Sequence, residues 1–224
     1  MLRFLQVKIF GPRPYRELVS KLAVSINGKY LSQAITGVQR YSIEIVKEWL
    51  KTGKQFHLQN PELSSIGRKN LSLWEQLLST KNQQDILWCP TNTGPLLCRN
   101  KVLTLHDGAV LSNPEWFSAQ YVAWRKVVVP RLLHSSRRII TVSAFSKGNI
   151  CEYTDIDESK VFNIHNGINH EQFYPRSDCQ SVLDHFGITK PYVLVLGSVE
   201  PRKNIERVFQ AWESLDKGLR DEYE

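Results

Sequence analysis

Short apolar runs alternate with helical patterns along most of this chain. The helical patterns lie over 38–51 and near 70–78, 115–134, 144–153, 179–186 and 205–215. Such alternation is typical of an α/β fold with a parallel sheet and helices on both faces. Because ligands of these sheets bind beyond the carboxyl ends of the strands, the loops that leave the strands are the first places to look for a site. The predicted strands are 22–26, 55–58, 85–88, 102–105, 138–142, 161–164 and 192–196.

The pattern divides the chain into parts. Residues 1–20 form an N-terminal extension, and 21–175 hold one complete Rossmann-like domain. A polar, Pro- and Gly-containing stretch at 176–190 predicts a linker. Residues 191–224 then hold only the first strand and helix of a second Rossmann-like domain, and one strand with one helix cannot close a core.

The cysteines and the N-terminal residues indicate the expected cellular location and whether a zinc site is expected. The cysteines Cys89, Cys98, Cys151 and Cys179 form no C-x-x-C pair, so we expect reduced thiols and no zinc site. No cofactor is expected. No apolar run is long enough to span a bilayer. Because Gln6 and Lys8 interrupt the first apolar residues, a signal peptide is not predicted and the expected location is the cytoplasm.

Positive charge is concentrated in the front part of the chain. The net charge is +7, and residues 200–224 carry five Lys/Arg against seven Asp/Glu, which leaves +9 for residues 1–199. Such a surface attracts phosphates or anionic lipid, so peripheral contact with the inner membrane face is one expectation. No nucleic-acid-binding module is recognisable, and no nucleic-acid partner is expected.

The segment from Gly197 to Asn204, Gly-Ser-Val-Glu-Pro-Arg-Lys-Asn, lies between a predicted strand and a helix. Gly197 permits a tight turn, and Arg202 and Lys203 lie beside the free N–H groups of a helix N-terminus. This combination suits a diphosphate. The alternative is a surface turn with both cations solvated.

A second motif is the His106-Asp107-Gly108 sequence at the end of a predicted strand. Histidine can carry a proton near neutral pH, and Asp107 can orient it. A histidine that only caps the strand end is the competing interpretation.

Three further loops follow predicted strands. The first, Thr36-Gly37-Val38-Gln39-Arg40, occupies the usual phosphate-loop position but lacks G-x-G-x-x-G, so no dinucleotide site is indicated. Ser143 precedes a helix and is a good N-cap, which explains it without function. Asn166-Gly167 is typical of a tight turn.

Taken in order, these five segments resemble the motifs of glycosyltransferase family 4, retaining enzymes of the GT-B fold. Bacterial mannosyl- and rhamnosyltransferases of O-antigen and exopolysaccharide synthesis are the most similar members. The resemblance implies transfer of a hexose from a nucleotide sugar, GDP-mannose-like or another, to a glycan or lipid-linked acceptor. It implies the following roles: His106 catalytic near the donor sugar; Arg202, Lys203 and Gly197 at the donor diphosphate; Thr36, Gly37, Gln39 and Arg40 in the loop facing acceptor and phosphates; Asp107, Ser143, Asn166 and Gly167 elsewhere in the cleft; no metal.

The chain departs from the family pattern after Leu215. Family members continue for about another domain, roughly 150 residues, which carries two glutamates that bind the donor and most of the base pocket. We therefore expect this chain alone to bind donor poorly. Two alternatives stay open beside an active transferase: a truncated, inactive remnant or one half of a split enzyme completed by a C-terminal-half polypeptide, and a GT-B-like sugar-nucleotide epimerase.

Overall fold

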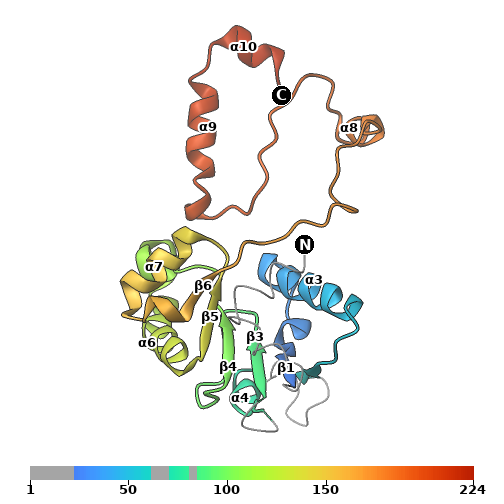
Figure 1. The fold of residues 1–224 in the computed structure, drawn as a ribbon. Helices are drawn as coiled ribbons and strands as arrows, with labels where there is room; N and C mark the ends of the chain where they lie inside the picture. The colour runs from blue at the N-terminus through green and yellow to red at the C-terminus, as the bar shows by residue number, and fades with distance from the viewer. Residues whose placement is uncertain (1–22, 62–70, 81–84) are drawn as a thin grey trace. The chain divides into compact units, whose positions relative to one another are not determined.

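The computed structural model describes residues 23–61, 71–80 and 85–224. The chain divides into two compact units, one ending at Asn166 and the other running from Gly167 to Glu224. Figure 1 shows the elements of each unit.

The first unit is built on one sheet whose described strands all run parallel, in the order β2-β1-β3-β4-β5-β6. In the register of the first three strands, Ile26 lies beside Leu58 on one side and Trp88 on the other. The predicted parallel α/β fold is confirmed, and six of the seven expected strands form within two residues of their predicted positions. The strands are β1 Val24–Asn27, β2 His57–Gln59, β3 Ile86–Cys89, β4 Lys101–Thr104, β5 Arg138–Thr141 and β6 Val161–Asn163.

Helices connect these strands. The pattern near 115–134 is divided, because a 3-10 turn starting at Pro114 ends before α6, and Ser118 between them has an extended backbone. Pro114 suits the first turn of η4, and the extended backbone at Phe117 and Ser118 separates that turn from α6. The helices are α3 Gly37–Lys51, α4 Leu71–Gln76, α5 Ala109–Ser112, α6 Ala119–Ser135 and α7 Ala144–Thr154, with 3-10 turns η1 Gly28–Ser32, η4 Pro114–Trp116 and η5 Glu158–Lys160.

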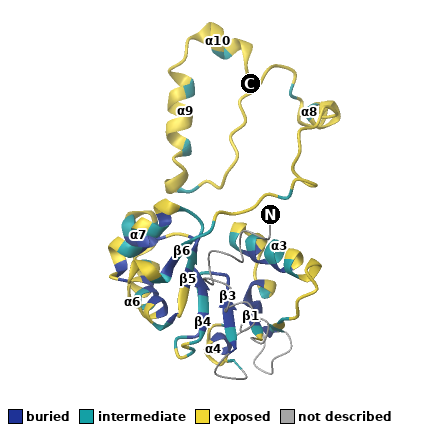
Figure 2. Ribbon diagram, in the orientation of Figure 1, coloured by how far each residue is buried: buried dark blue, intermediate teal, exposed yellow. Residues whose placement is uncertain are grey.

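Both faces of the sheet are covered (Figure 2). Successive side chains on β3 alternate between the faces, so Leu87 and Cys89 join one apolar cluster and Trp88 joins the other. Val46 of α3 belongs to the cluster around Trp88, whereas Val129 of α6 belongs to the cluster around Leu87. The sheet is therefore buried from both sides, as the continuous apolar strands predicted.

The second unit contains helices but no sheet. The expected strand at 192–196 does not form, and Leu194 and Leu196 are exposed. A strand needs a neighbour to pair its backbone groups, and here only the two backbone hydrogen bonds between Glu224 and residues 191 and 193 are made. No residue from 167 to 224 is buried (Figure 2). The elements are α8 Gln180–Phe186, the 3-10 turn η6 Pro201–Lys203, α9 Ile205–Glu213 and α10 Lys217–Glu222, the last of which was not predicted.

The predicted limits of the extension, domain and linker remain predictions.

Among the helices that the structure describes, none combines the length and apolar character needed to cross a membrane.

Candidate active site

The carboxyl edge of the sheet collects the predicted site residues of the first unit. Because all six described strands are parallel, their carboxyl ends lie at the same edge. The loop that leads into α3 follows β1, His106 follows β4, and Ser143 follows β5. The tertiary structure thus brings to one edge loops that are far apart in the sequence.

His106 is buried at this edge and held by the loop that leaves β3. Its Nε2 atom lies 3.0 Å from the carbonyl oxygen of Pro90. A carbonyl can only accept, so Nε2 carries the proton and Nδ1 remains the acceptor of the neutral ring. Burial lowers the pKa of His106 below its ordinary value, an effect that the Pro90 contact and the Asp107 carboxylate only partly oppose. The imidazole is therefore neutral at pH 7.

Asn92 fixes the backbone of His106. Its Oδ1 atom accepts a hydrogen bond from the His106 N–H at 2.8 Å, and its own N–H donates to the Thr104 carbonyl at 3.1 Å. Asn92 has a φ of 61°, the left-handed region that asparagine tolerates better than most residues. The loop after β3 thus holds both the ring and the backbone of His106.

Arg125 of α6 holds the same loop through a hydrogen bond to the Asn92 carbonyl. Its side chain is buried, and an Nη1 N–H donates to the Asn92 carbonyl at 3.1 Å. The guanidinium group also lies 5.9 Å and 5.8 Å from the ring centres of Tyr121 and Trp124. A rigid α6 side chain therefore supports Asn92, which in turn supports His106.

Tyr41 brings α3 against the histidine. Its ring meets the His106 ring edge-on with the ring centres 4.7 Å apart. Burial raises the pKa of Tyr41, so the phenol stays protonated. Behind it, the Trp88 Nε1–H donates to Thr104 Oγ1 at 3.0 Å. The side chains of Tyr41 on α3, Trp88 on β3 and His106 after β4 therefore pack together on one side of the candidate site.

Asp107 does not orient the imidazole, contrary to the expectation. Its Oδ1 atom accepts from the Ala109 N–H at 3.2 Å, at the start of α5, and the carboxylate is exposed. The Pro90 carbonyl takes the orienting role instead, because it lies on the neighbouring strand end and faces the ring.

The loop before α3 is held by its own polar side chains. Gln39 is buried, and its Oε1 accepts from the Thr36 N–H at 3.2 Å and from the Thr36 hydroxyl. Its Nε2 donates to Gln33 Oε1 at 3.1 Å. Gly37 and Arg40 are exposed, and the Arg40 guanidinium has no hydrogen-bond partner within residues 23–61, 71–80 and 85–224. Of the four predicted loop residues, Thr36, Gly37 and Arg40 are therefore accessible, and Gln39 is not.

A buried ion pair lies at the end of β1, and the sequence analysis missed it. Lys29 Nζ is 2.8 Å from Glu75 Oε2, and both side chains are almost fully buried. Asn27 Nδ2 and Thr93 Oγ1 each donate to Glu75 Oε1 at 2.8 Å. The four residues come from β1, η1, α4 and the loop after β3, and they tie those segments together.

Ser143 is the N-cap of α7, as predicted. Its Oγ atom accepts from the Ser146 N–H at 3.0 Å. By contrast, residues 164–169 form no turn, so the tight turn expected at Asn166-Gly167 is wrong. The chain runs from β6 directly across the boundary between the two units at this point.

The predicted diphosphate residues lie in the second unit. Arg202 and Lys203 belong to the exposed 3-10 turn η6, and the Arg202 Nε is 2.5 Å from Glu200 Oε2. The Arg202 contact lowers the pKa of Glu200. Asn204 precedes α9 with a φ of 51°, but its side chain makes no capping hydrogen bond. At Gly197 the backbone makes a bend.

Asn92, Tyr41, Arg125 and Glu75 were not selected from the sequence. Asn92 had one usable signal, its position in the loop that leaves a predicted strand. Arg125 and Glu75 had none, because each lies in a helix and acts on a residue that is more than 30 positions away.

Comparisons with known proteins agree with this architecture. The model of glycosyltransferase family 4 matches residues 53–172. The O-antigen chain mannosyltransferase B of Escherichia coli is 26% identical over 226 residues, covering 84% of this chain and 59% of that protein. The O-antigen chain mannosyltransferase RfbU of Salmonella typhimurium is 30% identical over 122 residues, covering 53% of this chain and 30% of that protein. The chain thus spans about three fifths or less of these relatives.

Two solved structures share the fold. WaaG, a glycosyltransferase involved in lipopolysaccharide biosynthesis, superposes with a TM-score of 0.57 at 14% identity, over 89% of this chain and 61% of its own. Anabaena HepE, solved in complex with UDP, gives a TM-score of 0.54 at 16% identity, over 88% and 58%. The expected GT-B type of fold is confirmed for this chain, except for the strand at 192–196.

Proposed function

This chain belongs to glycosyltransferase family 4, and we propose that it acts in a retaining transfer of a hexose from a nucleotide sugar to a glycan or lipid-linked acceptor. The observation that carries the proposal is the neutral His106 imidazole, buried and oriented at the carboxyl edge of the sheet. Ligands bind at that edge in open α/β sheets.

Mannose is the proposed sugar. Two of the similar proteins are named O-antigen mannosyltransferases, and a structural neighbour was solved with UDP. GDP-mannose is therefore the first donor to test, followed by UDP sugars. The product is proposed to enter a cell-surface polysaccharide of the O-antigen kind.

The chemistry of the transfer explains the use of a neutral histidine. Breaking the bond between the anomeric carbon and the diphosphate leaves positive charge on the sugar ring and negative charge on the leaving group. With Nε2–H bound to the Pro90 carbonyl, His106 offers Nδ1 to a hydroxyl of the donor sugar. A neutral ring orients the sugar without repelling its developing positive charge.

The negative charge of the leaving group is proposed to be balanced by Arg202 and Lys203. Arg202 already contacts Glu200, so a diphosphate would share the guanidinium with that carboxylate. In the first unit, Arg40 is the exposed cation of the α3 loop and is proposed to contact the acceptor or the donor phosphates.

The test is transfer by the 224-residue chain from GDP-mannose to a lipid-linked glycan, followed by nucleotide release and mass spectrometry of the product. We expect His106→Ala to lower turnover by about 10²–10³-fold, the scale of losing one transition-state contact. The double substitution Arg202→Gln with Lys203→Gln is expected to lower turnover on the same scale. The matched control is His57→Ala, an exposed histidine on β2. Equal rates for His106→Ala and the control would contradict the proposal, and a free epimer formed without acceptor would identify an epimerase instead.

A non-catalytic partner-binding role is the second candidate. Val208 and Phe209 on α9 are 40% and 64% exposed, an apolar pair that a second polypeptide could cover. Isothermal titration tests the two candidates. Binding of GDP-mannose by this chain more tightly than about 1 mM would favour the transferase over the partner-binding role, and it would contradict the poor donor binding expected from the sequence.

A further inference from the structure

The loop that orients His106 is itself held by residues outside the candidate active site. Residues 90–100 join β3 to β4 without forming a helix or a strand. Pro90 and Asn92, near the start of this loop, contact the ring and the backbone N–H of His106. An irregular segment has no ladder of backbone hydrogen bonds to fix its shape, so its side-chain contacts determine where those two groups lie.

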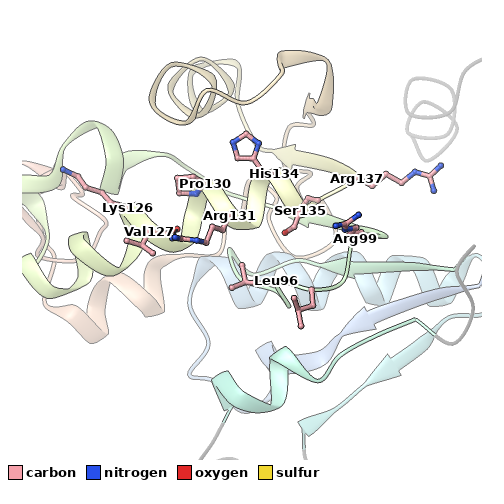
Figure 3. Close-up of a pocket in the computed structure, with 11 residues that line it drawn as sticks. Leu96, Arg99, Lys126, Val127, Pro130, Arg131, His134, Ser135 and Arg137 are labelled. Carbon is pink, nitrogen blue, oxygen red and sulfur yellow. Dashed lines mark hydrogen bonds between the residues drawn. The ribbon is translucent and has the colours of Figure 1, made fainter.

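One side of this loop is open. Leu96, Leu97 and Arg99 in its second half border a groove of about 930 Å³ beside the C-terminal half of α6 (Figure 3). Leu97 is 90% exposed there. Because the groove leaves this side of the loop uncovered, the position of the loop depends on contacts elsewhere along its length.

Helix α4 supplies such contacts from two consecutive residues. Glu75 Oε1 accepts a hydrogen bond from the Thr93 hydroxyl at 2.8 Å, and Gln76 Oε1 accepts one from the Leu96 N–H at 2.9 Å. Thr93 follows Asn92 directly in the chain. A hydrogen bond that fixes Thr93 therefore also restricts the backbone of Asn92.

The ion pair with Lys29 fixes the carboxylate of Glu75. Lys29 Nζ donates to Glu75 Oε2 at 2.8 Å, and Asn27 Nδ2 donates to Oε1 at 2.8 Å. Lys29 Nζ also donates to Thr93 Oγ1 at 3.5 Å, so this hydroxyl contacts both members of the pair. Because the pair has no net charge, its long-range field is weak, and it acts on the loop through these contacts.

We propose that Glu75 and Thr93 are positioning residues for His106. The ion pair fixes Glu75, Glu75 fixes Thr93, and the loop that contains Thr93 then orients the imidazole. The proposal goes beyond a contribution of the ion pair to stability. It rests on the proposed function for its effect on transfer, because there His106 is the catalytic residue.

The first test follows the titration of His106 by NMR in the 224-residue chain with isotope-labelled histidine, and it needs no substrate. The signal is identified by its loss in His106→Gln. Thr93→Val removes the hydroxyl without changing charge. Burial lowers the pKa of His106, so a loosened loop that admits water should move this pKa up toward its ordinary value. Thr93→Ser keeps the hydroxyl and should restore the titration of the unmodified chain.

The matched control is Thr91→Val in the same loop. Thr91 is buried, and within the described ranges its hydroxyl has no hydrogen-bond partner. The same chemical change at this position removes no contact to Glu75, so the titration of His106 should stay as it is. Equal melting temperatures of the two valine variants would show that a difference between them is not a difference in folding.

The charged and titratable groups that face the imidazole are the same in all these variants. Tyr41 of α3 meets the ring edge-on, and Asp107 follows it in the chain. Arg125 of α6 donates to the Asn92 carbonyl. A titration that differs between Thr93→Val and its control therefore reports how the loop holds the ring.

The second test measures transfer from GDP-mannose by the same variants. Displacing a catalytic group lowers turnover more than binding, so Thr93→Val should lower kcat by about 10–100-fold and change KM less than about two-fold. Thr93→Ser should recover most of the loss, and Thr91→Val should keep the unmodified rate.

The outcomes separate this inference from the proposed function. If Thr93→Val melts at a lower temperature but titrates at His106 like Thr91→Val, the contact is only structural and the inference is wrong. If His106→Ala transfers as fast as the unmodified chain, the proposed function is wrong, whereas a shifted titration in Thr93→Val would still show that Thr93 positions the ring.

Discussion

Asn92 Oδ1 lies 2.8 Å from the backbone nitrogen of His106 and accepts its hydrogen bond. This contact joins the loop after β3 to the residue that follows β4, so the position of the candidate catalytic histidine depends on a residue 14 positions earlier. The left-handed backbone of Asn92 makes the contact possible.

The first prediction concerns this contact. Asn92→Gly keeps the left-handed backbone but leaves the His106 N–H without its acceptor, which should lower the free energy of unfolding by about 1–3 kcal/mol. Asn92→Asp keeps an acceptor oxygen and should cost less than about 1 kcal/mol. Urea unfolding measures both. The role assigned to Asn92 fails if the two variants are equally stable.

The second prediction concerns the buried pair of Lys29 and Glu75. Lys29→Met should cost about 3–5 kcal/mol, because it leaves a buried carboxylate without its cation. The exposed pair of Lys47 and Glu44, with nitrogen and oxygen 2.9 Å apart, is the control, and Lys47→Met should cost less than about 1 kcal/mol.

A double-mutant cycle completes that test. Adding Glu75→Gln to Lys29→Met removes the uncompensated charge, so the double variant should be more stable than the sum of the two single losses predicts. Strict additivity would show that the two side chains do not interact energetically.

The third prediction concerns pH. The folded-state pKa of His106 is lowered by burial, so the unfolded chain binds a proton more readily than the folded one. The stability linked to His106 is therefore complete above the unfolded pKa of about 6.5 and decreases as pH falls from there toward the lower folded pKa. Unfolding free energies between about pH 7.5 and about pH 5 should decline less steeply for His106→Gln than for the unmodified chain.

The fourth prediction separates capping from chemistry at Ser143. Ser143→Ala removes the acceptor for the Ser146 N–H and should cost about 1 kcal/mol, whereas Ser143→Asp restores an acceptor and should recover most of that loss. Thermal unfolding of the two variants measures the difference. Equal melting temperatures would mean that the cap contributes nothing to α7.

Local patterns were sufficient for the strands and the longer helices of the first unit, but not for the short helix α5. Apolar runs predicted its six strands, helical spacing predicted α3 and α7, and Ser143 was identified as an N-cap because capping involves residues only three positions apart. The family resemblance also came from motifs in order along the chain, and the match over residues 53–172 confirms it.

The sequence by itself therefore determined the strands and the longer helices of the first unit, and which loops leave the carboxyl edge of its sheet. Only the tertiary structure decided which side chains meet there. Pro90 orients His106 where Asp107 was expected to, and Arg125 and Glu75 act across 33 and 48 positions. The apolar run at 192–196 failed as a strand for the same physical reason, since pairing, like burial, depends on a neighbour that the local sequence does not contain.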